Sequence, residues 1–302
     1  MTSTDAHGEL KQKYMANIPN AKAWKDFIWP GTVVNTDHLA SLKDAEFGPD
    51  DVVLISYPRS GTTWTSEVLS GIVHEGDTEL IKTIPFQDRV LWLELDPSLV
   101  APIAKTTLQK KRVYYIHLDL RFLPISVREG KCKVIYVARN PKDQAVSYYH
   151  FHRSVAFFGF KDLNWKDYLK YFVSGVICCG SWFEHVLGYW KLAKNNSNVK
   201  FIRYEDMKRN LVDEVKALED FIGVPLNEEQ RKKVIDHCSF DSMKNNKMVN
   251  KDGDEHFDAK VSKFVRKGIV GDWKNYFTVA QNEQFDELYK EKLEGSGLDF
   301  EF

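Results

Sequence analysis

Short apolar runs alternate with amphipathic stretches along this chain of 302 residues. The first clear run, 52–56 (VVLIS), follows the turn-forming residues 48–51 and is rich in β-branched side chains, which predicts a β-strand. Residues 62–73 carry apolar side chains at the spacing of one helix face, which predicts an α-helix. Together with the loop between them, these elements form a strand–loop–helix unit.

The same alternation recurs along the chain and indicates the fold class. Pro141 suits the first turn of a helix, and Asn140 and Asp206 are expected to cap helix amino termini. Short apolar strands alternating with helices are typical of an α/β domain with a central parallel sheet flanked by helices. In such sheets, ligands bind beyond the carboxyl ends of the strands. The further elements that the pattern predicts are strands at 112–118, 133–137 and 199–203, and helices at 143–151 and 211–221.

Composition limits the classes of protein to consider. Lys and Arg number 42 against 43 Asp and Glu, a formal net charge of -1, which does not suggest a nucleic-acid-binding protein. No apolar run approaches the roughly 20 residues of a membrane span, and the polar start MTSTDAHGELKQKY does not resemble a signal peptide. We therefore expect a soluble cytoplasmic protein. The length allows two domains, but no linker or repeat divides the chain and one α/β domain can also take all of residues 1–302. Residues 1–50 are expected to wrap around a core of 51–302.

The four cysteines, Cys132, Cys178, Cys179 and Cys238, give little sign of special chemistry. None forms a CxxC pair, and two of them are adjacent, which fits neither a zinc site nor a disulfide framework. We expect buried thiols in a reducing compartment, and no metal.

The most informative segment is 57–64 (YPRSGTTW), between the first strand and its helix. Its glycine lets the backbone approach a ligand, while hydroxyls, helix-start N–H groups and an arginine can donate to phosphate oxygens. A Walker A loop also needs an earlier Gly and a Lys after the last Gly, and both are missing. The alternative to an anion-binding loop is an ordinary capped helix start. Candidate anion-binding residues are Arg59, Ser60, Gly61, Thr62, Thr63 and Trp64.

Two further basic segments can serve the same anion. Arg139 ends a predicted strand and Ser147 lies on the following helix, so both can meet one phosphate group. Arg266 and Lys267 form a basic pair before Gly268. Such a pair usually belongs to a solvated face, but the neighbouring glycines favour a ligand loop.

These segments resemble the motifs of the cytosolic sulfotransferases. YPRSGTTW is similar to their phosphosulfate loop, usually YPKSGTTW; KVIYVARNPKDQAVSYYHF is similar to their 3′-phosphate segment, and RKGIVGDWKNYFT to their carboxyl-terminal signature. The similarity runs from about residue 50 almost to the end of the chain. It implies one α/β domain with a P-loop-like phosphosulfate-binding loop. It also implies transfer of a sulfuryl group from PAPS (3′-phosphoadenylyl sulfate, leaving PAP) to a hydroxyl or amine of a small, largely apolar acceptor.

The resemblance also implies roles for individual residues. The 5′-phosphosulfate is expected to lie on Arg59, Ser60, Gly61, Thr62, Thr63 and Trp64. The 3′-phosphate is expected to contact Arg139, Ser147, Arg266, Lys267 and Gly268, with Phe264 and Val265 alongside. The adenine is expected among Trp64, Tyr204 and Phe240, with Cys238 and Ser239 beside it. The family's KxxxTVxxxE dimerisation motif matches Lys274, Thr278, Val279 and Glu283 and implies a homodimer, although a capped helix entry explains the same residues.

His117 matches the family's catalytic histidine. A phenol or alcohol is a poor nucleophile while protonated, and a neutral imidazole is a natural general base. The alternative is a structural histidine, since the chain has nine. Arg59 is expected to neutralise charge that develops on the bridging oxygen. No carboxylate cluster suited to Mg²⁺ stands near the loop, so no metal is expected.

Two positions depart from the family pattern. Arg59 stands where the family usually has Lys, which keeps the charge but changes its geometry. Tyr115 stands where the family commonly has the Lys of KTHLP, so one charged contact to the transferring group is lost. We expect slow or narrowed activity for this reason. Asp119, close to the proposed base, suggests a bias towards amine acceptors.

Three functions compete at this stage. The leading hypothesis is a PAPS-dependent sulfotransferase whose acceptor pocket includes Trp92 and Phe151, although core packing explains these two rings equally well. The second hypothesis is a PAPS/PAP-binding member of the same fold whose catalysis is weakened by Tyr115. The third is a P-loop kinase, against which the missing Walker lysine argues.

Overall fold

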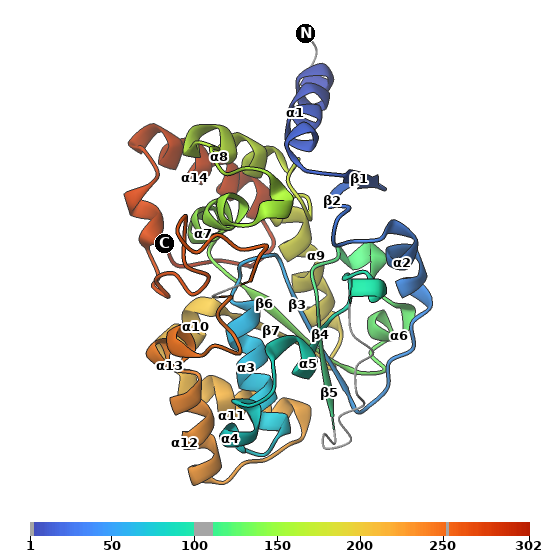
Figure 1. Ribbon diagram of the computed structural model, residues 1–302, viewed down its shortest axis with the longest axis vertical. Coiled ribbons are helices and arrows are strands. Elements are labelled where there is room, and N and C mark those ends of the chain that lie inside the picture. The colour runs from blue at the N-terminus through green and yellow to red at the C-terminus, as the bar shows by residue number, and fades with distance from the viewer. Residues whose placement is uncertain (1–2, 100–110, 252–253) are drawn as a thin grey trace.

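A five-stranded parallel sheet forms the centre of the structure, a computed structural model that describes residues 3–99, 111–251 and 254–302 (Figure 1). The strand order across the sheet is β4-β5-β3-β6-β7, and a separate antiparallel hairpin joins β1 to β2. The strands are β1 (Ala21–Trp24), β2 (Phe27–Pro30), β3 (Asp51–Ser56), β4 (Val90–Trp92), β5 (Arg112–Ile116), β6 (Lys133–Ala138) and β7 (Val199–Arg203).

The predicted α/β fold class and its four strands are confirmed. The difference that matters most is at β5, which ends at Ile116, so that His117 is the first residue beyond the sheet and not part of a strand. The short strand β4 and the β1–β2 hairpin were not predicted, because three or four residues give too little pattern to read.

Helices cover both faces of this sheet. Along β3, Val53 and Ile55 belong to one hydrophobic core and Val52 and Leu54 to the other, as the alternation of side chains in a strand requires. The first core includes residues of α1, α7, α8, α9 and α14, and the second includes residues of α3, α11 and α12, which lie below the sheet in Figure 1. The helices are α1 (Ser3–Asn17), α2 (Thr36–Ser41), α3 (Thr62–Val73), α4 (Thr78–Ile81), α5 (Phe86–Arg89), α6 (Ile125–Arg128), α7 (Pro141–Ser154), α8 (Trp165–Ser174), α9 (Trp182–Asn195), α10 (Tyr204–Arg209), α11 (Leu211–Ile222), α12 (Glu228–His237), α13 (Phe240–Asn245) and α14 (Val279–Leu293).

The helix starts follow from local chemistry in most places. Asn140 caps α7, since its side chain accepts from the backbone N–H groups of Lys142 and Asp143, and Pro141 is the first helical residue, as predicted. The prediction that Asp206 is a cap is wrong. Asp206 lies inside α10, and the cap of the following helix α11 is Asn210.

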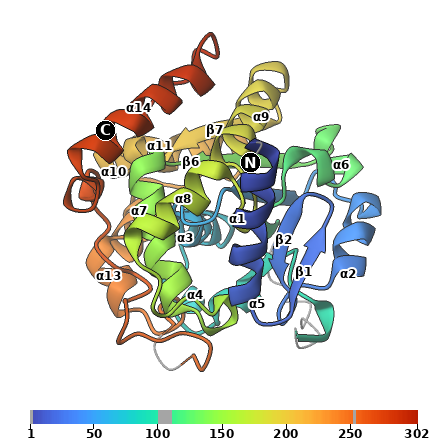
Figure 2. The same ribbon diagram turned by 90° about the horizontal axis from the view of Figure 1, so that it is seen from above.

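The amino-terminal residues pack on the first core. Tyr14, Phe27 and Trp29 are buried in it, and α1 lies beside α8 (Figure 2). The expected state of the four cysteines is confirmed, because all of them are free and buried. Among the residues that the structure describes, no helix has the length and apolarity to span a bilayer.

A buried ion network ties α3 to its neighbours. The Glu67 carboxylate on α3 accepts from Arg89 at 2.6 Å and pairs with His237 of α12 at 2.8 Å, and all three side chains are almost fully buried. Removing one partner from such a network leaves a charge without compensation, so the network fixes how α3 and α12 meet. Cys238, the next residue after His237, is thereby held against α3, the helix that follows residues 57–64, the loop predicted to bind phosphate and called the phosphate loop below.

Candidate active site

One cavity of about 290 Å³ lies beyond the carboxyl ends of β3, β5 and β6. The segments predicted from sequence to bind a ligand converge on it, as the topology of a parallel sheet requires. The predicted residues that line it are Arg59, Gly61, Thr62, Thr63, Trp64, Trp92, His117, Arg139, Ser147, Phe151, Tyr204, Cys238, Phe240, Phe264, Val265, Arg266, Lys267 and Gly268.

Two predicted residues do not line this cavity. The Ser60 hydroxyl is buried and donates to the Tyr57 carbonyl at 2.8 Å, so it holds the shape of the loop from within. The Ser239 side chain caps α13 by accepting from the Ser242 backbone N–H. Sequence spacing cannot separate these supporting hydroxyls from lining ones, because the direction of a loop side chain depends on packing.

The phosphate loop is shaped by a glycine whose conformation other residues rarely adopt. Gly61 has φ 99°, and a Cβ there would lie 2.7 Å from the ring of Tyr204. It also precedes α3, whose start has no side-chain cap, so the first backbone N–H groups of α3 are left for another partner. Since Thr62 and Thr63 line the cavity, this helix start is suited to an anion.

Arg59 lies between two aromatic rings. Its guanidinium carbon is 4.8 Å from the ring centroids of both Phe151 and Phe264, and its side chain donates to Ser147 Oγ (3.4 Å) and to the Phe264 carbonyl (2.9 Å). Burial, and then the charges of Arg139 and Arg266, lower the pKa of Arg59 to about 10. The side chain remains charged at neutral pH, and a bound anion would relieve the repulsion among the three arginines.

The other cationic side chains differ in whether a carboxylate neutralises their charge. Arg139 lies over the Tyr204 ring at 4.4 Å and donates to the Ile269 carbonyl (3.3 Å), while its Nε is buried without a hydrogen-bond partner among the described residues. Arg266 and Lys267 both pair with buried Asp272, at 2.6 and 2.7 Å. Burial tends to raise the pKa of Asp272, but these two partners outweigh it and lower the pKa to about 2.

Another part of the cavity, beside the arginine cluster, is lined by the aromatic side chains of Trp64, Tyr204 and Phe240. Trp64 Nε1 donates to the Cys238 carbonyl at 2.8 Å, which fixes the indole plane, and the Tyr204 ring meets it edge-on at 5.4 Å. A Cβ at Gly268 would lie 2.3 Å from the Phe240 ring, so that glycine permits the close approach of the two segments. This end offers flat apolar surfaces beside positive charge, which suits a nucleotide base next to its phosphates.

His117 is oriented through its own ring. Nδ1 lies 2.7 Å from the Ser56 carbonyl, which can only accept, so Nδ1 carries the proton and Nε2 is left with a free lone pair. Burial, together with the charges of His185 and Arg59, lowers the pKa of His117 to about 4. The imidazole is therefore neutral at physiological pH and able to accept a proton at Nε2.

Two buried side chains that sequence reasoning missed hold the backbone of His117. The Glu94 carboxyl accepts from the His117 backbone N–H, and His185 Nε2 donates to the His117 carbonyl at 3.1 Å. Tyr136 donates to the other nitrogen of His185 at 2.8 Å and so fixes its tautomer. A lone acid inside the apolar run LWLEL was the one sequence signal for Glu94.

The wall beyond His117 is aromatic. Trp92 stacks on Tyr115 with ring centroids 6.0 Å apart, and both line the cavity together with Phe151. Trp92 and Phe151 also pack against the first core, so core packing does not prevent these rings from lining the cavity. Asp119 instead caps a 3₁₀ turn and binds Arg121, and no acidic side chain occurs among the described residues that line the cavity.

The residues of the expected dimer motif lie away from this cavity. Lys274, Thr278, Val279 and Glu283 are all exposed. Thr278 caps α14 in a capping box with Gln281. Val279 is 75% exposed, which is unusual for a β-branched apolar residue at a helix start.

Comparisons with known proteins agree with this geometry. A family model described as a sulfotransferase domain matches residues 49–297. The chain is 40% identical over 296 residues to sulfotransferase 1A1 of Canis lupus familiaris (95% of each chain). It is 38% identical over 277 residues to sulfotransferase 1C2 of Homo sapiens (90% of this chain, 92% of that one).

The solved structure of mouse sulfotransferase SULT7A1 complexed with PAP has a TM-score of 0.72 at 34% identity, over 91% of this chain and 95% of that chain. Retinol dehydratase in a complex with retinol and PAP shares the fold, with a TM-score of 0.81 at 24% identity over 100% and 97%.

We predict that Glu94 makes the free energy of unfolding decrease as the pH rises. Burial raises the pKa of Glu94 to about 8, although the His117 backbone N–H opposes the shift, whereas the unfolded value is 4.5. Folding therefore takes up a proton between these values, and stability falls by about 1.4 kcal/mol per pH unit in that window. Glu94→Gln cannot ionise and still offers an acceptor to His117, so it should lack this slope in urea unfolding at pH 5.5, 6.5 and 7.5. Glu229→Gln, at an exposed site, is the control, and equal slopes for Glu94→Gln and the unmodified protein would contradict the prediction.

Proposed function

The chain belongs to the sulfotransferase domain family, and we propose that its cavity binds PAPS and transfers the sulfuryl group to a small, largely apolar acceptor at His117. The observation that carries the proposal is the convergence of three arginines and one neutral imidazole on a single cavity. The same cavity holds the aromatic residues expected around the adenine. A family relative of known structure binds PAP.

The charge balance of the cavity supports a ligand with two phosphate groups. Arg59 and Arg139 form no ion pair with a described carboxylate, and the Nε of Arg139 is a buried donor without an acceptor. Buried donors without partners are costly, so the site is complete only with an anion in place. Arg139, Ser147, Arg266 and Lys267 would hold a 3′-phosphate, and the start of α3 with Arg59 would hold the phosphosulfate.

The chemistry assigns separate tasks to the residues present. PAPS supplies a sulfuryl group on a phosphate that leaves as an anion. His117 takes the acceptor proton at Nε2, because Nδ1 is committed to the Ser56 carbonyl. Arg59 and the N–H groups at the start of α3 stabilise negative charge on the leaving phosphate. The aromatic wall keeps water from the reacting atoms, so that hydrolysis does not compete.

The lining of the cavity favours a hydroxyl acceptor over an amine. A protonated amine would need an anionic partner, and no acidic side chain lines the cavity in the described part of the chain. Asp119, which suggested amine acceptors, is committed to Arg121. We therefore propose uncharged aromatic or alicyclic alcohols and phenols as acceptors.

The weakened-enzyme hypothesis rests on Tyr115. Burial, with a smaller contribution from the Glu94 carboxyl, raises the pKa of Tyr115, so its phenol stays neutral and adds no positive charge beside His117. The hydroxyl can still donate one hydrogen bond to the transferring group. We propose that this lowers the rate without abolishing transfer.

Two further proposals concern the protein as a whole. We infer that residues 1–50 wrap around a functional core of 51–302 within one domain, which the burial of Tyr14 and Trp29 in the first core supports. We infer a cytoplasmic location, which four free cysteines support.

We predict that His117→Ala abolishes most of the transfer while preserving nucleotide binding. Loss of a general base costs roughly 10²- to 10⁴-fold in rate, so transfer of labelled sulfate from PAPS to 2-naphthol should fall by that factor. PAP binding measured by calorimetry should stay within about twofold, since His117 is not among the proposed phosphate ligands. His7→Ala, at an exposed site on α1, is the control. Absence of PAP binding by the unmodified protein, or Mg²⁺-dependent ATP turnover, would overturn the proposed function.

We predict that Tyr115→Lys raises the turnover rate. A charged donor beside the transferring group stabilises the transition state, and one such contact is worth roughly a hundredfold in rate. The measurement is kcat for 2-naphthol at saturating PAPS, with the melting temperature as a check on folding. Tyr115→Phe keeps the ring and should not exceed the unmodified rate. An unchanged or lower rate in a folded Tyr115→Lys protein counts against the idea.

We propose that Lys274, Thr278, Val279 and Glu283 form a symmetric homodimer contact, and predict that Val279→Glu separates it. Val279 is the exposed apolar residue of this motif, and a carboxylate facing its own copy across a two-fold axis is repulsive. Light scattering after gel filtration should show a mass falling from twice to once the 35.0 kDa of one chain. A monomeric unmodified protein, or an unchanged mass in the variant, would refute the contact.

A further inference from the structure

The segment 178–180, between α8 and α9, contributes two residues to the cavity wall. Cys178 and Cys179 line the cavity, with their sulfur atoms 3.8 Å apart. Cys179 has φ 69° and Gly180 has φ 73°, two consecutive residues in the left-handed region. A non-glycine residue is strained there, so contacts from outside the segment must hold this conformation.

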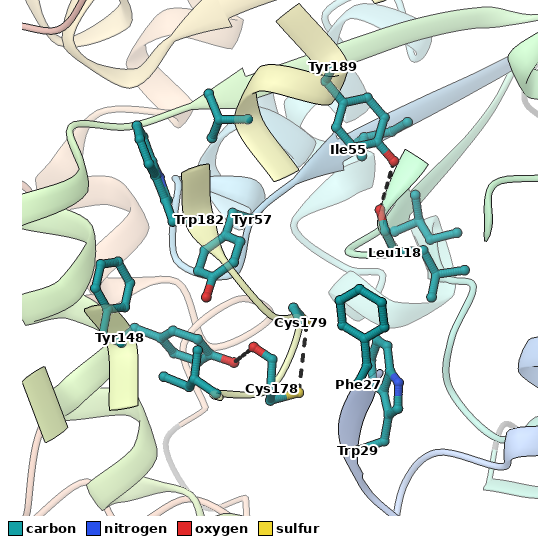
Figure 3. Packing of buried hydrophobic residues seen from close by; sticks show 14 of the residues in the cluster. Phe27, Trp29, Ile55, Tyr57, Leu118, Tyr148, Cys178, Cys179, Trp182 and Tyr189 are labelled. Carbon is teal, nitrogen blue, oxygen red and sulfur yellow. Dashed lines mark hydrogen bonds between the residues drawn. The ribbon is translucent and has the colours of Figure 1, made fainter. Parts of the chain in front are cut away.

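Three buried tyrosine hydroxyls supply these contacts. Tyr148 donates to the Cys178 carbonyl at 3.3 Å (Figure 3), and Tyr57 donates to the Gly180 carbonyl at 2.7 Å. The backbone N–H of Cys178 donates to the hydroxyl of Tyr14 at 3.0 Å. Tyr57 begins the phosphate loop and Tyr148 lies on α7, whereas Tyr14 comes from the amino-terminal helix α1.

The Tyr14 contact belongs to a closed ring of hydrogen bonds. Nδ1 of His152 donates to the Tyr148 carbonyl at 2.9 Å, so its Nε2 is the acceptor for the Tyr14 hydroxyl at 2.7 Å. Burial lowers the pKa of His152 to about 3, which keeps this ring neutral. Tyr14, His152, Tyr148 and Cys178 thus satisfy one another, and all four side chains are buried. Such fully satisfied buried networks specify one arrangement of the chain.

We infer that Tyr14 is a positioning residue that fixes the acceptor wall at 178–180 and so helps determine which acceptors the enzyme takes. The inference rests on the proposed sulfuryl transfer and deepens it. Without the Tyr14 hydroxyl, the Cys178 N–H and His152 Nε2 both lose their partners while buried, and the wall gains freedom to move. An acceptor that reaches the wall then binds less well, whereas a small acceptor close to His117 is little affected.

The test compares phenol with 2-naphthol as acceptors for the full-length Tyr14→Phe protein. We expect the KM for 2-naphthol to rise about tenfold, the KM for phenol to rise less than threefold, and both kcat values to stay within about twofold. PAP affinity, measured by calorimetry, should be unchanged, because no cavity-lining cation contacts Tyr14. Backbone hydrogen exchange in a peptide containing 176–181 should become faster, which reports the wall directly and without turnover.

Tyr168→Phe is the matched control. Tyr168 is as buried as Tyr14 and its ring lies 5.4 Å from His152, but its hydroxyl has no hydrogen-bond partner in the described part of the chain. Its ratio of KM for 2-naphthol to KM for phenol, and its hydrogen-exchange rates in 176–181, should match those of the unmodified protein. His152→Phe removes both ring nitrogen atoms and so breaks the same hydrogen-bond ring from α7. It should raise the KM for 2-naphthol, as expected for Tyr14→Phe, which covers the case in which Tyr14→Phe fails to fold.

The outcomes separate two kinds of failure. If the unmodified protein transfers sulfate and the folded Tyr14→Phe or His152→Phe protein keeps its ratio of KM for 2-naphthol to KM for phenol and its exchange rates, the role of Tyr14 is refuted while the proposed function stands. If the unmodified protein transfers no sulfate to either acceptor, the proposed function fails, and the specificity role fails with it.

Discussion

The register between β3 and β5 is the constraint on which the active site depends. Ile55 pairs with Ile116, so Ser56, the last residue of β3, and His117, the first residue after β5, lie side by side. That adjacency gives the bond from His117 Nδ1 to the Ser56 carbonyl, which sets the tautomer of the base. It also places the base next to the phosphate loop, which begins at the residue after Ser56. A shift of one residue would turn the His117 side chain to the other face of the sheet.

Around this point the protein maintains two opposite electrostatic conditions within one cavity. The half-buried Arg59 keeps its charge although burial lowers its pKa, whereas burial holds the imidazole of His117 neutral. The two conditions reinforce each other, because nearby positive charge further disfavours a proton on the base. An anion at the arginines would weaken that effect and raise the pKa of His117, so under the proposed function nucleotide binding would make His117 a stronger base.

The nucleotide half of the site could be predicted from sequence because its signals are local. The run YPRSGTTW contains the glycine, the arginine and the helix start together, and its residues mostly line the cavity as expected. The partners of these residues could not be predicted in the same way. Glu94 and His185 lie far from His117 in sequence and reach it only through tertiary packing. Ser60 is an error of the opposite kind: it was predicted to line the site, but its hydroxyl is buried and donates to the Tyr57 carbonyl.

The acceptor half of the site is built differently, and this difference bears on how specificity can change. Its wall at 178–180 is held by single hydroxyls from three separate elements, one of which belongs to the amino-terminal helix outside every recognised motif. Each of these hydroxyls makes one hydrogen bond to the wall. We therefore expect that replacing one tyrosine by phenylalanine moves the wall without disturbing the arginine cluster. The phosphate loop has no such freedom, since Gly61 is confined by the Tyr204 ring and by its own φ. Under the proposed function, the fold would therefore fix the donor end tightly and leave the acceptor end adjustable, an arrangement that suits enzymes with one donor and different acceptors.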